Sequence, residues 1–411
     1  MRLPFRRPSR PRRIRPDIRP WLVPLALAAA ACREDSGGGL DPPDDADQGT
    51  SPTPGCVDGT LESGALFRIC FPGQWNGDLV VYAHGYVSAY EPIALPDDRV
   101  EGRRVEEIVQ DLGYAYATTS YRANGLAVTE AVEDLRLLEA TVRARYRPDP
   151  PRTYLVGVSE GGLVATLGVE RAGEPFDGAL AACGPIGDFR HQIDYIGDFR
   201  VVFDYFFPGV LPGSPVLPPD EVRADWDRYG AEIARALLDD PIATLQLLRV
   251  TGASVDPGRP ATVGATVLGL LWYNVFAAPD LQQRLGGQPF DNTSRVYAGS
   301  LDDAALNAGV ARFAADLAAN RNVAERLTTT GHPTVPLVAL HTDRDPVVPV
   351  EQQRLYGEKV AQAGLAERVE PITVERYGHC AFTLAELTDA FTRLVERVAA
   401  EPHLAGVLGG P

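Results

Sequence analysis

The sequence contains few of the residues from which metal sites are built. It has six histidines and five cysteines in 411 residues, and neither type occurs at a spacing typical of metal ligands. We therefore predict no zinc or other metal site, and no motif in the chain indicates a cofactor.

Positive charge is also scarce. Lysine and arginine number 39 against 55 aspartates and glutamates, which gives a net charge of −16. Eight arginines and only one aspartate lie in the first 20 residues, so removal of residues 1–31 would bring the net charge to −23. Proteins that bind nucleic acid depend on basic groups to neutralise phosphates. This balance therefore excludes nucleic acid as a partner.

Long apolar runs are few. The stretch ATVGATVLGLLWYNVFAA, residues 261–278, has 18 residues without a charge, which is long enough to consider a membrane span. Glycine and polar residues interrupt it, and it lies in the middle of the chain. These features favour a buried helix or a lid helix over a span.

The N-terminus reads as an export signal. An arginine-rich segment precedes the apolar run Trp21–Ala31 and then Cys32, a pattern typical of signal sequences. The sequence LAAAAC, Leu27–Cys32, resembles the lipobox of bacterial lipoproteins, although Ala29 stands where leucine is usual. The resemblance implies lipidation of Cys32 and a location at the bacterial cell envelope. Two alternatives remain: cleavage of the signal with release of the protein to the exterior, or a signal that stays uncleaved as an anchor. Residues 32–55 hold little to bury and predict a flexible acidic tether.

Four cysteines remain after Cys32, and an even number in an exported chain predicts two disulfides with three possible connectivities. Cys56 and Cys70 flank a plausible hairpin, so we pair them. Cys183 is then left to pair with Cys380, next to His379.

From Leu66 onward, short β-rich runs alternate with helical patterns. The predicted strands are Leu66–Phe71, Asp78–His84, Tyr114–Tyr121, Thr153–Val158, Asp177–Ala182, Val335–His341 and Val369–Arg376. The predicted helices are Arg99–Leu112, Thr129–Tyr146, Gly161–Arg171, Val350–Ala363 and Leu384–Ala399. This alternation indicates an α/β fold with a mostly parallel sheet and helices on both faces, in which ligands bind beyond the carboxyl ends of the strands.

One long interval breaks the alternation. Residues 185–333 are mostly helical or irregular in pattern and rich in aromatic residues. We predict that they form an inserted, mainly helical cap over a core made of residues 56–184 and 334–411.

The stretch GVSEG, Gly157–Gly161, joins a predicted strand directly to a predicted helix. Glycine two residues either side of Ser159 removes side chains that would collide in so sharp a turn. Taken alone, the motif fits either a nucleophile or a solvated serine in a glycine-rich turn.

Two later motifs decide between these readings. HTDRDPVVP begins at His341 and YGHC ends at Cys380, each after a predicted strand. Together with GVSEG, which we call the elbow, they make three motifs. These motifs resemble the α/β-hydrolase family over residues 66–400, in the family's order of serine, acid and histidine. The resemblance implies that Ser159 is the nucleophile, His379 its general base and Asp345 the acid that orients the imidazole.

Asp343 is the second candidate for the acid. We expect it to cap the turn instead, which is a common role for aspartate.

The resemblance also implies an oxyanion hole made by main-chain N–H groups. The donors would be the N–H of Glu160, which follows the nucleophile, and the N–H of Tyr86 in the motif His84–Tyr86. We expect their side chains to matter little, and we interpret His84 as a buried structural residue.

The leading hypothesis is therefore an exported serine hydrolase that cleaves a small carboxylic ester through an acyl-enzyme. Family members that are dehalogenases or epoxide hydrolases carry aspartate at the elbow, where this chain has Ser159. Tannases and feruloyl esterases share a cysteine after the histidine, as Cys380 is here, but have another before the serine, where this chain has Val158. A peptidase acting on short peptides is the enzymatic alternative, and a non-catalytic binding lipoprotein is the other.

Overall fold

The computed structural model describes residues 53–146, 152–171 and 173–401. The predicted export signal, Cys32 and nearly all of the predicted tether lie outside these residues. The first strand begins at Gly55, which is the last residue assigned to the tether.

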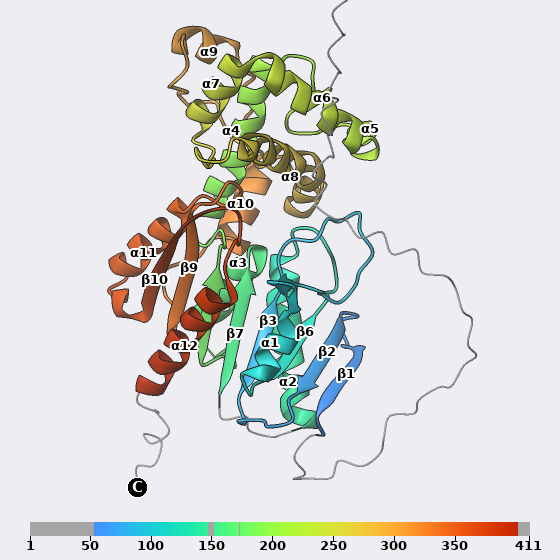
Figure 1. Cartoon of the computed structure of the whole chain (residues 1–411), viewed down its shortest axis with the longest axis vertical. Coiled ribbons are helices and arrows are strands. Elements are labelled where there is room, and N and C mark those ends of the chain that lie inside the picture. Colours follow the sequence, from blue (N-terminus) through green and yellow to red (C-terminus); the bar gives the residue numbers. More distant parts are fainter. Residues whose placement is uncertain (1–52, 147–151, 172, 402–411) are drawn as a thin grey trace, which may run out of the picture. The chain divides into compact units, whose positions relative to one another are not determined.

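A single eight-stranded sheet forms the centre of the protein (Figure 1). Its strands, in chain order, are β1 (Gly55–Thr60), β2 (Leu66–Phe71), β3 (Leu79–Ala83), β6 (Ala115–Thr119), β7 (Thr153–Val158), β8 (Gly178–Ala182), β9 (Leu337–Arg344) and β10 (Val369–Tyr377). In space the order is β1-β2-β6-β3-β7-β8-β9-β10. The pairs β1–β2 and β2–β6 are antiparallel, and every other pair is parallel.

Helices cover both faces of this sheet. On one face lie α1 (Val105–Asp111) and α12 (Leu384–Ala400); on the other lie α2 (Val128–Arg145), α3 (Glu160–Glu170) and α11 (Glu351–Gln362), with the short 3₁₀ turn Ala366–Arg368 following α11. Successive side chains of a strand point to opposite faces. Leu79 and Val81 of β3 accordingly join the core under α2 and α3, while Val80 and Tyr82 join the core under α1 and α12.

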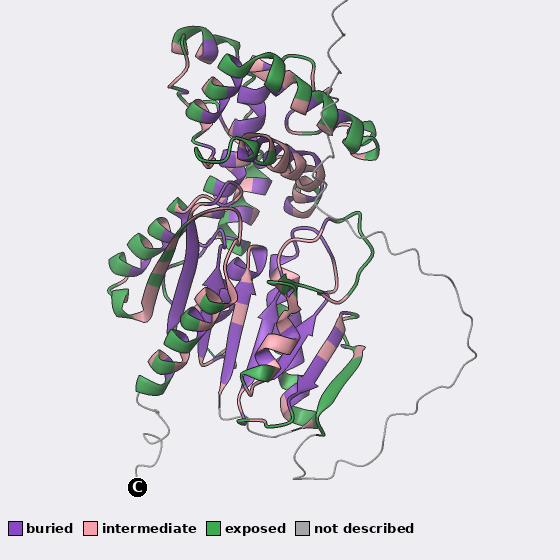
Figure 2. Ribbon diagram, viewed as in Figure 1, coloured by how far each residue is buried: buried purple, intermediate pink, exposed green. Residues whose placement is uncertain are grey.

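The central strands are buried on both sides, whereas the outer surfaces of the helices are exposed (Figure 2). This burial explains why the parallel strands are continuous apolar runs in the sequence. The α/β-hydrolase fold class is confirmed.

The helix predicted over Arg99–Leu112 is only half correct. Its first part is a hairpin of β4 (Arg99–Val100) and β5 (Arg103–Arg104), and the helix begins at Val105. Glu101 and Gly102 between these strands have φ angles of 51° and 84°. A two-residue hairpin turn with positive φ at both positions matches the twist of its strands, so this turn overrides the local helical pattern.

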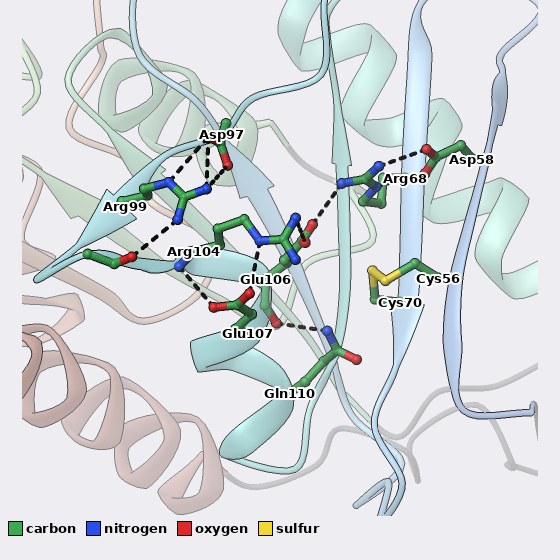
Figure 3. Close-up of polar contacts among 11 residues, drawn as sticks. Cys56, Asp58, Arg68, Cys70, Asp97, Arg99, Arg104, Glu106, Glu107 and Gln110 are labelled. Carbon is green, nitrogen blue, oxygen red and sulfur yellow. Dashed lines mark hydrogen bonds and ion pairs between the residues drawn. A yellow bond between two sulfur atoms is a disulfide. The ribbon is translucent and has the colours of Figure 1, made fainter. Parts of the chain in front are cut away.

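The disulfide Cys56–Cys70 joins directly opposed residues of β1 and β2, at one edge of the sheet. Figure 3 shows the polar contacts beside it. Arg68 of β2 donates to Asp58 of β1 at 2.8 Å and to the largely buried Glu106 of α1 at 3.1 Å. The edge strand β1 is thus bonded covalently to β2, and Arg68 of β2 pairs with a residue of each neighbouring element, Asp58 of β1 and Glu106 of α1.

Between β8 and β9 the described chain forms helices in place of strands. They are α4 (Phe189–Phe206), α5 (Asp220–Ala224), α6 (Trp226–Asp239), α7 (Pro241–Thr251), α8 (Ala261–Leu285), α9 (Asp303–Gly309) and α10 (Leu317–Arg326). We call residues 185–333 the insertion. α4 is central to it, because it contacts α7, α8 and α10.

Within the insertion, the fully buried Arg200 of α4 donates to Asp204 at 2.8 Å and to Asn274 of α8 at 3.0 Å. α8 contains the uncharged stretch of the sequence. Of the helices in the described ranges, it alone has the length and apolar composition of a membrane span. Here it packs against α4, α6 and α10, with Leu270, Leu271 and Val275 buried.

Candidate active site

The serine lies at the turn between β7 and α3. Ser159 has a φ of 56° and a ψ of −122°, a strained conformation that the structure enforces through close backbone contacts. A Cβ atom added to Gly157 would lie 1.9 Å from the carbonyl oxygen of Gly161, and one added to Gly161 would lie 2.0 Å from that of Ala83. Both glycines are therefore required for the turn that presents the serine hydroxyl.

The structure brings Ser159, His379 and Asp345 together from three separate turns at the carboxyl ends of β7, β10 and β9. The Ser159 hydroxyl lies 2.8 Å from Nε2 of His379, and Nδ1 of the same ring lies 2.8 Å from Oδ2 of Asp345. In this chain of contacts the hydroxyl donates to Nε2 and the Nδ1–H donates to the carboxylate. The imidazole is thus held in the tautomer that can accept the serine proton.

Asp345 is buried and fully hydrogen-bonded. Its Oδ1 accepts from the N–H groups of Val347 at 2.8 Å and Val348 at 3.0 Å, which leaves Oδ2 for His379. Burial by itself would raise the pKa of this carboxyl. The charge and hydrogen bond of His379 outweigh burial, and the pKa is lowered. The lowered pKa keeps Asp345 ionised beside the imidazole.

A second histidine lies near the same carboxylate. Nε2 of His341 is 3.7 Å from Oδ2 of Asp345, but its N–H donates to the carbonyl of Val348 at 2.9 Å. Burial lowers the pKa of His341. It is therefore a neutral structural residue that supports the loop carrying the acid.

Asp343 faces away from the imidazole, but it does not cap its own turn as expected. Its Oδ1 accepts from the N–H of Arg376 in β10 at 2.7 Å and pairs with Arg344 at 3.3 Å. β9 and β10 have an irregular register between Val374 and Tyr377, and the carboxylate satisfies a backbone donor there. The expected role was wrong because the partner lies on a strand that only the tertiary fold brings close.

The structure contains the second disulfide, Cys183–Cys380, with a Cα separation of 5.4 Å. It connects the end of β8 to the residue after His379. Both cysteines have positive φ angles, 49° and 51°, which are uncommon for residues other than glycine. Nε2 of His379 lies 3.5 Å from the Cys380 sulfur. The two sulfurs and the imidazole have the proximity of a metal site, but the disulfide occupies both sulfurs.

The predicted oxyanion donors lie beside Ser159. A Cβ added to Gly85 would be 3.2 Å from Cβ of Ser159, so the chain before Tyr86 passes against the serine. Tyr86 and Glu160 line the same cavity as Ser159. In the described part of the chain neither of their N–H groups has a protein acceptor, and both remain available to a ligand.

His84 lies next to this loop and is buried, as expected. Its Nδ1–H donates to the carbonyl of Gly85 at 2.7 Å, and its ring stacks on Tyr121 with 3.9 Å between centroids. Burial lowers the pKa of its imidazole. These contacts fit a residue that shapes the loop and has no direct part in the chemistry.

A cavity of about 120 Å³ opens at Ser159 between the sheet and the insertion. Most of its lining is apolar, including Leu126, Phe189, Ile193, Ile196, Tyr273 and Leu281. α4 is fastened to the loop of Asp345, because Gln192 donates to the carbonyl of Val347 and Tyr195 donates to that of Pro346. The insertion therefore supplies the outer wall of the cavity and contacts the acid loop directly.

The side chain of Glu160 is a feature that the sequence reasoning missed. It is buried, it lines the cavity, and its Oε1 accepts from the N–H of Ala127 at 3.2 Å. Burial raises the pKa of this carboxyl to about 8. The signal in the sequence was an acidic residue in an otherwise apolar stretch, directly after the nucleophile.

No family model matches the chain, and no curated protein matches it. Among solved structures, the chain is similar to an esterase of Pyrococcus furiosus, at 16% identity and a TM-score of 0.42, over 84% of this chain and 90% of that one. It is similar to an esterase of Aspergillus oryzae at 15% identity and a TM-score of 0.46, over 80% and 78% of the two chains. It is also similar to an acylaminoacyl peptidase of Pyrococcus horikoshii at 12% identity and a TM-score of 0.43, over 85% of this chain and 41% of that one. These likenesses concern the fold, and the chemistry follows from the site residues alone.

Proposed function

We propose that the protein is a serine hydrolase that cleaves small carboxylic esters through an acyl-enzyme intermediate. The observation that carries this proposal is the pair of 2.8 Å contacts that link Ser159, His379 and Asp345 at the mouth of an apolar cavity. A hydroxyl activated by imidazole is a nucleophile suited to acyl transfer.

In the first half of the reaction, Ser159 Oγ attacks the ester carbonyl while Nε2 of His379 accepts the hydroxyl proton. The N–H groups of Glu160 and Tyr86 stabilise the oxyanion that forms. Breakage of the ester bond releases the alcohol, which takes the proton from His379. In the second half, His379 deprotonates a water molecule that attacks the acyl-enzyme, and Ser159 regains its proton as the acid product leaves.

Asp345 stabilises the imidazolium in both halves without accepting the proton. Its lowered pKa supports this role, because the carboxylate stays charged whenever His379 is protonated.

The cavity supports a preference for short acyl groups. Its volume is about 120 Å³, whereas a dry cavity of roughly 150 Å³ holds a benzene molecule. We therefore expect kcat/KM to be higher for esters of short acyl chains than for esters of long ones.

We also propose that the protein is exported, with Cys32 as the site of a lipid anchor. The arginine-rich N-terminus, the apolar run and the lipobox-like LAAAAC support this proposal. The two disulfides are consistent with an oxidising compartment.

A fluorophosphonate probe tests the enzymatic proposal directly. The full chain should be labelled at Ser159 under native conditions, and Ser159→Ala should not be labelled. Turnover of p-nitrophenyl esters should then exceed turnover of aminoacyl-arylamides. Faster cleavage of the amides would indicate a peptidase, and an unlabelled wild type would indicate a non-catalytic binding protein.

A further inference from the structure

The carboxyl group of Glu160 is only partly satisfied by the protein. Among the described residues it receives one hydrogen bond, from the Ala127 N–H to Oε1, and Oε2 has no protein partner. Other residues that line the cavity lie close to it, since its charge interacts with those of the Tyr86 and Tyr273 phenols. Oε2 is therefore free to accept a hydrogen bond from a ligand in the cavity.

No cation is available to fill this gap. Glu160 is the only charged residue that lines the cavity within the described part of the chain. The arginine whose charge acts on Glu160 is Arg284 of α8, and its guanidinium already pairs with Asp280 at 2.9 Å and with Glu130 of α2 at 3.1 Å.

The charged groups of the neighbouring elements make the site electronegative. Asp280 of α8 and Glu130 of α2 both raise the pKa of Glu160, in the same direction as its burial, while Arg284 and the Ala127 N–H oppose them. The phenols of Tyr86, Tyr121 and Tyr273 face the same carboxyl and are neutral. At neutral pH the carboxyl is therefore largely protonated, and it can both donate and accept a hydrogen bond.

A second acceptor lines the same cavity. Gln192 of α4 is buried, and its Nε2 donates to Val347, which fixes the orientation of the amide. Its Oε1 is buried without a hydrogen-bond partner among the described residues. The cavity thus combines apolar walls with two hydrogen-bond acceptors on opposite layers, one from the core and one from the insertion.

We propose, on the basis of the serine hydrolase function above, that Glu160 is a specificity-determining residue that binds a hydroxyl or amine group carried by the substrate and disfavours a carboxylate there. A hydroxyl or amine supplies the donor that Oε2 lacks. Above pH 8, where Glu160 is ionised, a carboxylate would bring a second negative charge into a site with no free cation, where the low local dielectric makes repulsion strong.

Two series of esters test this proposal with the full chain. Ethyl esters of three-carbon and six-carbon acids, ending in methyl, hydroxyl, amine or carboxylate, place the end group on the acyl side. Propyl acetate, 3-hydroxypropyl acetate and the O-acetyl derivative of 3-hydroxypropanoate place it on the alcohol side. In at least one of the two series, kcat/KM should be about tenfold higher for the hydroxyl-ended ester than for the methyl-ended ester. One added hydrogen bond contributes about this factor. In that series, measured at pH 9 so that Glu160 is ionised, kcat/KM for the carboxylate-ended ester should be at least tenfold lower than for the methyl-ended ester. The amine-ended esters carry a positive charge as well as a hydrogen-bond donor. Comparing them with the hydroxyl-ended esters therefore separates the effect of charge from that of hydrogen bonding alone.

Glu160→Gln is the decisive variant, because it keeps the size and the hydrogen-bonding capacity of the side chain but cannot ionise. At pH 9 it should relieve the penalty against the carboxylate and abolish any advantage of amine over hydroxyl. The exposed Glu133→Gln on α2 removes a negative charge away from the cavity and should leave the preferences unchanged.

Two outcomes would overturn the proposal: a wild type that is indifferent to the end group or prefers carboxylate, or a Glu160→Gln variant with the wild-type preferences. Labelling of Ser159 by the fluorophosphonate separates these results from a failure of the hydrolase function itself. If Glu160→Gln does not fold, the end-group preference of the wild type still decides the question.

Discussion

The Thr342 hydroxyl donates a hydrogen bond of 2.7 Å to the carbonyl oxygen of Gly378, the residue before His379. Thr342 occupies a position where the α/β-hydrolase motif usually has glycine, and its side chain is fully buried. β9 thus supports the loop of His379 through the Thr342 side chain, and Asp345, directly after the strand, supports it by a second contact.

We expect Thr342→Val to lower kcat by roughly tenfold and to destabilise the fold by about 1–3 kcal/mol, because the Gly378 carbonyl loses its donor. Thr342→Ser keeps the hydroxyl and should stay near wild type in kcat. Steady-state kinetics and urea unfolding of the two variants provide the measurement. A larger loss in Thr342→Ser than in Thr342→Val would assign the effect to packing of the methyl group, which serine lacks and valine keeps.

Asp345→Asn should reduce kcat by a factor on the order of 10⁴ with the fold intact, because an amide favours the wrong imidazole tautomer. Asp343→Asn should keep most of the activity, since Asp343 bonds Arg376 and Arg344 and not His379. The comparison is made by kinetics at a fixed pH. The reverse ranking of the two variants would show that Asp343 is the catalytic acid.

Loss of the disulfide Cys183–Cys380 should reduce activity more than loss of Cys56–Cys70. The first bond holds the residue next to His379, whereas the second lies at the outer edge of the sheet. We expect the double variant Cys183→Ser, Cys380→Ser to lose at least tenfold in kcat. Either pair of substitutions should cost about 2–5 kcal/mol of stability. Kinetics of the two double variants under identical conditions decide the point, and equal kcat values would contradict it.

The raised pKa of Glu160 predicts a pH dependence of stability. Its ordinary pKa of 4.5 rises to about 8 in the folded protein. The native state therefore binds the proton more tightly than the unfolded state. The stability that this provides is fully present below pH 4.5 and is lost as the pH rises through 8, by an amount on the order of a few kcal/mol.

Glu160→Gln should consequently gain stability relative to the wild type as the pH rises from 5 to 9. Urea unfolding of both proteins at several pH values measures this difference. The comparison cancels the similar effect of Asp198 in the insertion, whose pKa burial raises to about 6. A constant difference across the range would show that Glu160 has an ordinary pKa in the folded state.

Local chemistry let the sequence predict most of the core and the serine. The alternation of apolar strands with amphipathic helices predicted the parallel sheet, because both features follow from the periodicity of a single segment. The elbow was predictable for the same reason: Gly157 and Gly161 are required by contacts within a few residues and with the adjacent strand.

Tertiary structure decided what distant segments do to one another. The sequence shows an acidic residue at position 160, but its environment depends on Ala127, Asp280 and the phenols of Tyr86, Tyr121 and Tyr273, all from other parts of the chain. Likewise Asp343 was assigned to its own turn, although its partner Arg376 belongs to the neighbouring strand. The sequence therefore determined which groups can react. The environment that sets their pKa values and their partners arose only when segments more than 30 residues apart packed together. Desolvation and pairing are properties of a site and not of a segment.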